Sequence, residues 1–272
     1  PSYWSGKGRG AADADADQIS REMSIEPLEA GGAPLALEED EPVGDAGVVT
    51  HRLRKVFGSA TKPSVVGLDL QMRRGQITAL LGANGAGKTT TIAMLTGLIP
   101  PTSGDATIDG RRCSTEMRTI RESLGVCPQQ NVLFEPLSPT LHLRLFGALK
   151  GLRGAELHKA IDALLQMVML SERAHVKSAV LSGGQKRKLC LAISLIGGSS
   201  TLFLDEPTSG MDPHSRRSIW QLLRAQREGR TLVLTTHFLD EAEMLADRIA
   251  IMAEGTTGRV SDTAHGPRLL LT

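Results

Sequence analysis

The chain has 272 residues, of which 40% are hydrophobic and 22% are charged, which is ordinary for a soluble globular protein with one large domain. Its formal net charge of +1 and aromatic content of 3% argue against a nucleic-acid partner, because such proteins need a concentrated basic face or stacking platforms. No apolar run approaches the roughly 18–20 residues that cross a bilayer, and neither a signal peptide nor an initial methionine is present. We therefore expect a cytosolic piece of a longer protein, with any membrane part outside these residues.

The first 46 residues differ in composition from the rest. They include an alternating Ala/Asp stretch over 11–17 and an acidic run over 38–41, and such a composition cannot bury enough apolar surface to order itself. We predict a disordered acidic linker over 1–46, a folded domain over 47–258 and a C-terminal tail over 259–272.

Short apolar or β-branched runs predict strands, and longer amphipathic segments predict helices. Their alternation indicates α/β units around a mostly parallel sheet. Strand signals disappear between about 131 and 180, which predicts a helical insertion. The predicted strands cover 65–72, 77–81, 124–127, 201–204, 231–235 and 248–252, and the predicted helices cover 88–98, 155–169, 185–196, 213–227 and 238–246.

Residues 82–89 match the pattern GxxxxGK[ST] of a phosphate-binding loop, and a predicted strand and helix flank them. The glycines let the backbone wrap around phosphates with its N–H groups turned inward, and the helix N-terminus adds partial positive charge. Lys88 would neutralise the β- and γ-phosphates, and Thr89 would supply a hydroxyl to Mg²⁺. An accidental glycine-rich turn is the weaker interpretation in this context. By itself the loop indicates nucleotide binding in general.

The strand predicted over 201–204 ends in two acids, Asp205 and Glu206. A parallel strand delivers its last residues to the carboxyl edge of the sheet, where the phosphate-binding loop also lies. Asp205 is then placed to hold Mg²⁺ through water, and Glu206 to act as general base on the attacking water. His237 could contact the γ-phosphate, and Gln129 could sense Mg²⁺ and the attacking water. Taken alone, an acidic turn or a single histidine after a strand is commonly structural.

Leu-Ser-Gly-Gly-Gln at 181–185, just before a predicted helix, resembles the signature sequence of ABC ATPases. The other motifs follow in the order of that family: 82–89 resembles Walker A, Gln129 the Q-loop, 201–206 Walker B, 209–212 the D-loop and His237 the H-loop. The resemblance runs from about 48 to 258. Six motifs in the correct order identify the chain as similar to an ABC ATPase domain.

The resemblance implies an α/β P-loop NTPase core with a mostly parallel sheet, an antiparallel β portion on the N-terminal side and a helical subdomain at about 131–180. It also implies ATP and Mg²⁺ as cofactors. The implied catalytic residues are Glu206, His237, Gln129 and Lys88, and the implied Mg²⁺ ligands are Thr89, Gln129 and Asp205. The implied nucleotide-binding residues are Phe57, Gly82, Asn84, Gly85, Ala86, Gly87, Lys88, Thr89, Thr90, Ser182, Gly183, Gly184, Gln185 and Asp212.

The signature of this family acts on a partner. Two such domains pair head to tail, so that the Ser and Gly N–H groups of one signature, here Ser182 and Gly184, cap the γ-phosphate on the other domain's P-loop. Hydrolysis removes those contacts and lets the pair open. The resemblance therefore implies a second nucleotide-binding domain as partner.

Further runs at 75–82, 89–91, 95–98, 100–104, 124–129 and 131–134 are similar to the A subfamily of ABC transporters, large single chains that mostly move lipids. This implies a membrane-associated ATPase domain on the cytoplasmic face, with transmembrane domains and a second ATPase domain in the same full-length chain. Residues 2–4 and the acidic linker resemble the segment before the first ATPase domain. Phe57 stands where a Tyr often stacks on adenine, Gln130 stands where His is frequent, and 138–142 departs from the usual Thr-Val-x-Glu-His.

Two other functions are compatible with the motifs. A soluble ABC clamp on ribosomes or DNA would use the same ATP-driven closure, but such proteins usually carry basic patches or special insertions that are not evident here. A regulatory module would bind ATP without hydrolysing it, which the presence of Glu206 and His237 argues against. Contacts to a transported substrate would lie in membrane segments outside this chain.

Overall fold

The computed structural model describes residues 45–58 and 60–262, with the backbone alone for 258–262. All but the end of the linker predicted over 1–46 lies outside the described residues, as do 263–272 of the predicted tail. The strands are β1 (Ala46–Lys55), β2 (Val65–Arg73), β3 (Ile77–Leu81), β4 (Ser103–Ile108), β5 (Arg111–Arg112), β6 (Leu124–Cys127), β7 (Thr201–Asp205), β8 (Thr231–Thr236), β9 (Arg248–Ala253) and β10 (Thr256–Asp262). The helices are α2 (Lys88–Leu95), α3 (Cys113–Ser123), α4 (Pro139–Leu149), α5 (Gly154–Met167), α6 (Gly183–Leu195), α7 (Pro213–Ala225) and α8 (Leu239–Leu245), with short 3-10 turns η1 (Ser171–Arg173) and η2 (Ser178–Val180).

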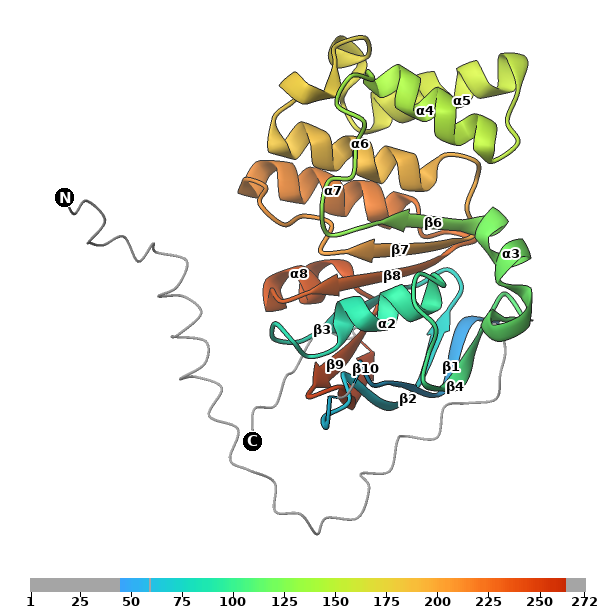
Figure 1. Ribbon diagram of the computed structural model, residues 1–272. Coiled ribbons are helices and arrows are strands. Elements are labelled where there is room, and N and C mark those ends of the chain that lie inside the picture. Colours follow the sequence, from blue (N-terminus) through green and yellow to red (C-terminus); the bar gives the residue numbers. More distant parts are fainter. Residues whose placement is uncertain (1–44, 59, 263–272) are drawn as a thin grey trace, which may run out of the picture. The chain divides into compact units, whose positions relative to one another are not determined.

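A six-stranded sheet forms the centre of the domain, with the strand order β10-β9-β3-β8-β7-β6. All neighbouring pairs are parallel except β10 and β9. Parallel strands need crossover connections, and helices supply them here (Figure 1). The predicted α/β core with a mostly parallel sheet is therefore confirmed.

Alternate residues of the central strands face opposite sides of this sheet. In β8, Leu232 and Leu234 join a hydrophobic core with α6, α7 and α8, whereas Val233 joins a second core with α2 on the other face. Phe203 of β7 lies in the same core as Val233, and all four side chains are fully buried. Because helices and strands cover both faces, the central strands are nearly continuous apolar runs.

A four-stranded antiparallel sheet with the order β2-β1-β4-β5 contributes to the core that contains α2. Its β1 strand shifts register between Thr50 and Leu53, and Arg52 in this bulge has a φ of 45°. The antiparallel portion predicted on the N-terminal side is thus confirmed. The apolar pattern does not predict β4 itself, since that strand begins with Ser103, Gly104 and Asp105, of which Gly and Asp are depleted in strands.

Several predicted helix ends are wrong for identifiable reasons. The helix predicted over 88–98 ends at Leu95, and Gly97 takes the left-handed conformation, with a φ of 69°, that commonly follows a helix. Helix α6 begins at Gly183, before the predicted start at 185, because Ser182 and Gln185 form a capping box. Helix α3 is not predicted by the apolar pattern, since Ile120 is its one buried residue.

Helices α4 and α5 pack on each other and on α6, within the segment predicted to be helical. Figure 1 shows them on the far side of α6 from the antiparallel sheet.

At the C-terminal end of the described residues, β10 continues beside β9 to Asp262, so the domain end predicted at 258 falls inside a strand. Among the described residues, no helix has both the length and the apolar character needed to cross a membrane.

A buried histidine holds the segment before α4. His142 is fully buried, and its Nε2 accepts a hydrogen bond from the backbone N–H of Phe134 at 2.9 Å. The proton therefore lies on Nδ1, which donates to the carbonyl of Ser138 at 2.9 Å. Burial lowers the pKa of His142, and the hydrogen bond to the Ser138 carbonyl opposes this shift in part. The neutral ring thus ties residues 134–138 to α4.

Because its pKa is lowered in the folded state, His142 contributes stability above the unfolded-state pKa of about 6.5, and this stability is lost as the pH falls below that value. We expect the free energy of unfolding to fall toward pH 5 with a contribution from this group of at most about 1.4 kcal/mol per pH unit. In His142→Gln the slope should be smaller over that window. Urea unfolding at pH 5 to 8 measures it. Equal slopes in the wild type and His142→Gln would contradict the prediction.

Candidate active site

Four parallel strands end at one edge of the central sheet and bring the predicted site residues together. The loop over 82–87 follows β3, Gln129 follows β6, Asp205 ends β7 and Glu206 follows it, and His237 follows β8. The register pairs Leu81 with Thr236 and Asp205 with Thr235, so the strands stop at nearly the same level. Polar side chains that are far apart in sequence therefore surround one space.

The loop after β3 leads directly into α2 and leaves the start of that helix open. Gly87 occupies the N-cap position with a φ of 99°, and no side chain caps the helix. The first N–H groups of a helix have no intrahelical partner, and they favour a negative group at this end. The ammonium of Lys88 donates to the carbonyls of Gly82 at 2.6 Å and Ala83 at 3.0 Å, which lays it across the loop.

Lys88 lies among groups with opposing electrostatic effects. Its residue is 5% exposed, and desolvation lowers its pKa, while the negative charges of Glu206 and Asp205 act in the raising direction. The carbonyls that Lys88 contacts satisfy part of its hydrogen-bonding capacity but carry no full charge. The positive charge at the loop is thus only partly compensated, which suits an anionic ligand.

Asp205 forms the second polar group at this edge. Its Oδ1 accepts from the hydroxyl of Thr89 at 3.3 Å and from that of Thr235 at 2.5 Å, and the residue is 3% exposed. Asp205 and Thr89 thus place two oxygen atoms that could bind a metal ion side by side at the start of α2. Mg²⁺ in nucleotide sites is usually held by one or two carboxylates and a few further oxygens, including those of the phosphates.

Glu206 connects the two remaining polar side chains. Its Oε2 accepts from Gln129 Nε2 at 3.1 Å, and its Oε1 lies 3.1 Å from His237 Nδ1. Glu206 has a φ of 48°, a left-handed conformation that is unfavourable for a residue with a Cβ atom. Its backbone N–H donates to Thr235 Oγ1 at 2.9 Å, which helps to hold that conformation. The three side chains therefore form one hydrogen-bonded row.

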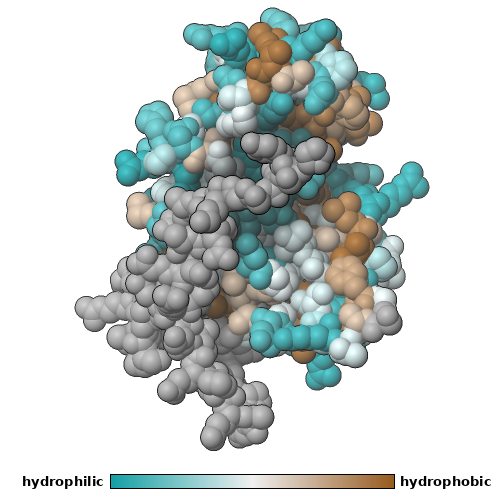
Figure 2. All heavy atoms as spheres, turned by 60° about the vertical axis from the view of Figure 1, so that its left-hand side comes forward, coloured by the Kyte–Doolittle hydropathy of each residue, from teal (hydrophilic) through white to brown (hydrophobic). Residues whose placement is uncertain are grey.

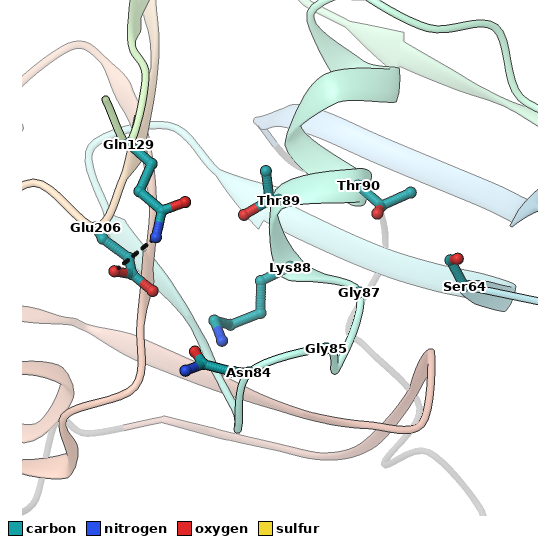
Figure 3. Close-up of a pocket in the computed structure, with 9 residues that line it drawn as sticks. All are labelled: Ser64, Asn84, Gly85, Gly87, Lys88, Thr89, Thr90, Gln129 and Glu206. Atoms are coloured by element: carbon teal, nitrogen blue, oxygen red, sulfur yellow. Dashed lines mark hydrogen bonds between the residues drawn. The ribbon is translucent and has the colours of Figure 1, made fainter. Parts of the chain in front are cut away.

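These groups surround an open cavity of about 400 Å³. Figure 3 shows Gln129 and Glu206 on one side of it and the start of α2, with Lys88 and Thr89, on the other. Asp205 and His237 are not among the lining residues, but each contacts one of them: Asp205 contacts Thr89, and His237 contacts Glu206. The lining residues are Ser64, Asn84, Gly85, Gly87, Lys88, Thr89, Thr90, Gln129 and Glu206.

Other predicted site residues lie elsewhere. Phe57 is exposed, with Lys55 Nζ 5.2 Å from its ring centroid, and it does not line the cavity. Ser182 caps α6 by accepting from the N–H of Gln185 at 3.2 Å, and Asp212 caps α7 by accepting from the N–H of Ser215 at 2.9 Å. Gly82 and Ala86 belong to the loop after β3 but do not line the cavity. Gly183 and Gly184 lie in the first turn of α6.

Sequence reasoning missed several residues that shape the site. Ser64 lines the cavity from just before β2, and Thr235 bonds to both acids. Glu241 is 1% exposed and accepts from Thr208 Oγ1, Trp220 Nε1 and Thr236 Oγ1. Arg187 contacts the segments of Gln129 and Glu206. A spacing pattern cannot reveal these residues, because their partners are distant in sequence.

The residues present fit a nucleotide with Mg²⁺. A cavity of about 400 Å³ joins a helix start without a side-chain cap, a buried ammonium and two adjacent oxygen donors. Glycine is also required where the loop passes close to the rest of the chain. A Cβ atom on Gly87 would lie 2.5 Å from the carbonyl oxygen of Ser64, and one on Gly82 would lie 2.3 Å from that of Met252.

Comparison with known families agrees with this geometry. A family model described as ABC transporter matches residues 65–209. The chain belongs to the ABC transporter family. As a member it is an ABC ATPase domain, since its fold and motifs are those of the ATP-binding cassettes described below.

The ABC ATPase domain is similar to A-subfamily proteins. Phospholipid-transporting ATPase ABCA3 of Homo sapiens is 48% identical over 257 residues, which cover 94% of this chain and 15% of ABCA3. Phospholipid-transporting ATPase ABCA7 of Homo sapiens is 50% identical over 82% of this chain and 10% of its own length. ATP-binding cassette sub-family A member 17 of Rattus norvegicus is 49% identical over 80% and 12%. The predicted subfamily resemblance is confirmed, and the chain spans a small part of each relative.

Solved structures confirm the ABC ATPase fold. The dimeric post-hydrolysis state of the ATP-binding cassette MJ0796, bound to ADP and Pi, aligns with a TM-score of 0.73 at 27% identity, covering 79% of this chain and 98% of that one. The ATP-binding subunit of an ABC transporter aligns with a TM-score of 0.72 at 29% identity, covering 79% and 89%. These relatives give no support to the alternative of a soluble clamp on ribosomes or DNA.

In this ABC ATPase domain, we expect Gly87→Ala to be more harmful than Gly85→Ala. Both glycines have a positive φ, so both substitutions should cost about 1–2 kcal/mol of stability through left-handed strain. A Cβ on Gly87 also meets the Ser64 carbonyl, whereas nothing lies within 4 Å of one on Gly85. This clash should add roughly 1–3 kcal/mol and weaken nucleotide binding. Urea unfolding and nucleotide titration measure both effects, and equal stabilities of the two variants would contradict the prediction.

Proposed function

We propose that this domain binds ATP with Mg²⁺ in the cavity at the sheet edge, hydrolyses it and thereby powers transport by a larger membrane protein. The observation that carries the proposal is the hydrogen-bonded row of Gln129, Glu206 and His237, which faces Lys88 and the start of α2 across the cavity. A carboxylate in that position faces the site where the γ-phosphate of a nucleotide on the loop would lie.

The phosphate-binding residues act through charge and N–H donors. Lys88 and the first N–H groups of α2 neutralise and orient the β- and γ-phosphates. Asn84, Gly85 and Thr90 line the same cavity and help to enclose the phosphates. Thr89 and Asp205, with Gln129, would hold Mg²⁺, which supplies positive charge against the phosphate oxygens when bound.

Glu206 is the proposed general base. Its carboxylate accepts a proton from water as that water attacks the γ-phosphate, while Gln129 and His237 orient the carboxylate and the water. Asp205 stays bound to the hydroxyls of Thr89 and Thr235 and does not compete for this role. Two neighbouring carboxylates can therefore perform different tasks. This arrangement argues against a module that only binds ATP.

We further propose that the signature acts on a second ATPase domain. Ser182 and Gly183 are exposed at the start of α6, outside the cavity of their own chain. A helix start with exposed N–H groups is suited to capping a phosphate held by another domain. Gly184, Gln185 and Asp212 would complete that contact. The solved structure of the similar MJ0796 cassette is dimeric, which supports pairing of two such domains.

The proposed transported substrate class is lipid or another amphiphile, because two relatives are named phospholipid-transporting ATPases. We propose that this is the first of two ATPase domains of a full-length transporter, on the cytoplasmic face of its membrane and joined by the acidic linker. Exposed hydrophobic residues suit contact with transmembrane domains: Val132 and Phe134 follow Gln129, and Leu141 and Leu145 lie on α4. Figure 2 shows such hydrophobic patches at the end of the domain that carries α4 and α5.

Glu206→Gln tests the catalytic proposal. The substitution keeps the size and hydrogen-bonding capacity of the side chain but removes its basicity. We expect ATP affinity within about twofold of wild type and phosphate release slower by at least about 100-fold. In the full-length transporter the same substitution should stop lipid translocation in reconstituted vesicles. Glu228→Gln on the exposed surface provides the control and should hydrolyse ATP normally. Wild-type turnover in Glu206→Gln would contradict the role of this residue.

Gly183→Asp tests the role of the signature in the partner site. Nothing lies within 4 Å of a Cβ on Gly183, and an acid in the first turn of α6 should leave stability unchanged or raise it by about 0.3–1 kcal/mol. Its charge would face the partner's γ-phosphate, so ATP binding to the chain's own loop should persist while turnover falls by at least about tenfold. Ala155→Asp at the exposed start of α5 is the matched control. Normal turnover in Gly183→Asp would exclude the proposed contact.

A further inference from the structure

Arg187 is a buried arginine whose N–H groups all point at backbone carbonyls. It lies near the start of α6, and its residue is 2% exposed. A guanidinium has five N–H donors in a fixed plane, and here five carbonyl oxygens accept from it. Nε donates to Pro207 at 3.0 Å, Nη1 to Pro128 at 2.5 Å and Gln129 at 3.1 Å, and Nη2 to Asp205 at 2.5 Å and Glu206 at 2.9 Å.

These carbonyls belong to two segments that sequence separates widely. Pro128 and Gln129 follow β6, whereas Asp205, Glu206 and Pro207 end and follow β7. An apolar side chain would fill the same volume without bringing a charge into the core, and burying a charge is costly unless its hydrogen bonds are satisfied. The acceptors are backbone atoms, so Arg187 fixes the course of the chain at both segments.

The backbone at Glu206 needs such a fixation. Its φ of 48° is unfavourable for a residue with a Cβ atom, so the conformation persists only where neighbours hold it. Thr235 holds the N–H of Glu206 at 2.9 Å, and Arg187 holds its carbonyl at 2.9 Å. In this conformation the carboxylate lies 3.1 Å from Gln129 Nε2 and 3.1 Å from His237 Nδ1.

We infer that Arg187 is a positioning residue for ATP hydrolysis: its guanidinium holds the backbones of Gln129 and Glu206 in the one relative arrangement that sets the catalytic row. The inference rests on the proposed role of Glu206 as general base. Arg187 does not touch the cavity, so it acts through these two residues and leaves the phosphate-binding loop unchanged. Losing it should therefore affect turnover and spare ATP binding.

The test compares Arg187→Lys and Arg187→Met in the full-length protein that contains this chain. Lysine keeps the charge but has three N–H donors on a single nitrogen, so it cannot replace all five hydrogen bonds, and methionine keeps the volume and loses all donors. We expect kcat to fall about 10-fold in Arg187→Lys and about 100-fold in Arg187→Met, since small misplacement of catalytic groups has effects of this size. The Kd for ATP should stay within about twofold of wild type in both.

The control reproduces the same kind of contact away from the cavity. Lys150 Nζ donates to the carbonyls of Arg121, Glu122 and Leu124 at 2.8, 3.0 and 2.5 Å. Lys150→Met should lower thermal stability and leave kcat unchanged, which separates loss of a structural cation from loss of positioning. The milder Arg187→Lys keeps the test decisive where Arg187→Met does not fold.

Glu206→Gln, measured in parallel, separates the proposed role of Arg187 from the proposed role of Glu206. Its kcat gives the activity that remains without the general base. An inactive Glu206→Gln with wild-type kcat in Arg187→Lys and Arg187→Met would overturn the positioning role and leave the proposed function intact. An equal loss of ATP affinity and kcat in the Arg187 variants would also overturn it, because that result indicates general disruption of the fold. An active Glu206→Gln would remove the proposed function itself.

Discussion

The parallel pairing of β3, β8, β7 and β6 is the constraint on which the candidate active site depends. Its register stops the strands at one level, so the loop over 82–87, Gln129, Glu206 and His237 emerge at the same edge. A shift by one residue would move every side chain of a strand into the core on the opposite face, where its size and shape would not match its neighbours. Hydrophobic cores on both faces oppose such a shift. Apolar packing thus fixes the positions of polar atoms with which it makes no contact.

A second constraint separates two consecutive acids. In a regular strand, Asp205 and Glu206 would point to opposite faces of the sheet. The left-handed conformation at Glu206 interrupts that alternation, so Asp205 contacts Thr89 while the Glu206 carboxylate reaches Gln129 and stays at the cavity. Strain of this kind persists where surrounding contacts enforce it, and it occurs often at functional sites. The left-handed conformation of Glu206 therefore keeps both carboxylates near the start of α2, at the carboxyl edge of the sheet.

The fold and much of the site could be predicted from local sequence. The central strands are apolar because both of their faces are buried, and the glycine pattern of the loop reflects steric limits at Gly82 and Gly87. The apolar pattern does not predict helix α3, because Ile120 is its one buried residue. It does not predict β4 either, because that strand begins with polar residues and a glycine. The contacts of Arg187 and Glu241 could not be predicted, because hydrogen bonds between distant segments leave no periodic signal in the sequence.

Helix α6 connects the exposed signature to the segments after β6 and β7 that carry Gln129 and Glu206. Ser182 at its N-cap and Gly183 in its first turn are exposed, and its second turn carries the buried Arg187. The capping box between Ser182 and Gln185 satisfies two backbone N–H groups at the start of the helix, so the exposed turn and Arg187 belong to one hydrogen-bonded element. Two of the five hydrogen bonds of the guanidinium go to the carbonyls of Gln129 and Glu206, so a displacement of the exposed turn would be felt at both backbones. In the head-to-tail pair proposed above, a partner's nucleotide that displaced this turn would thereby act on the catalytic row of the chain that carries the turn.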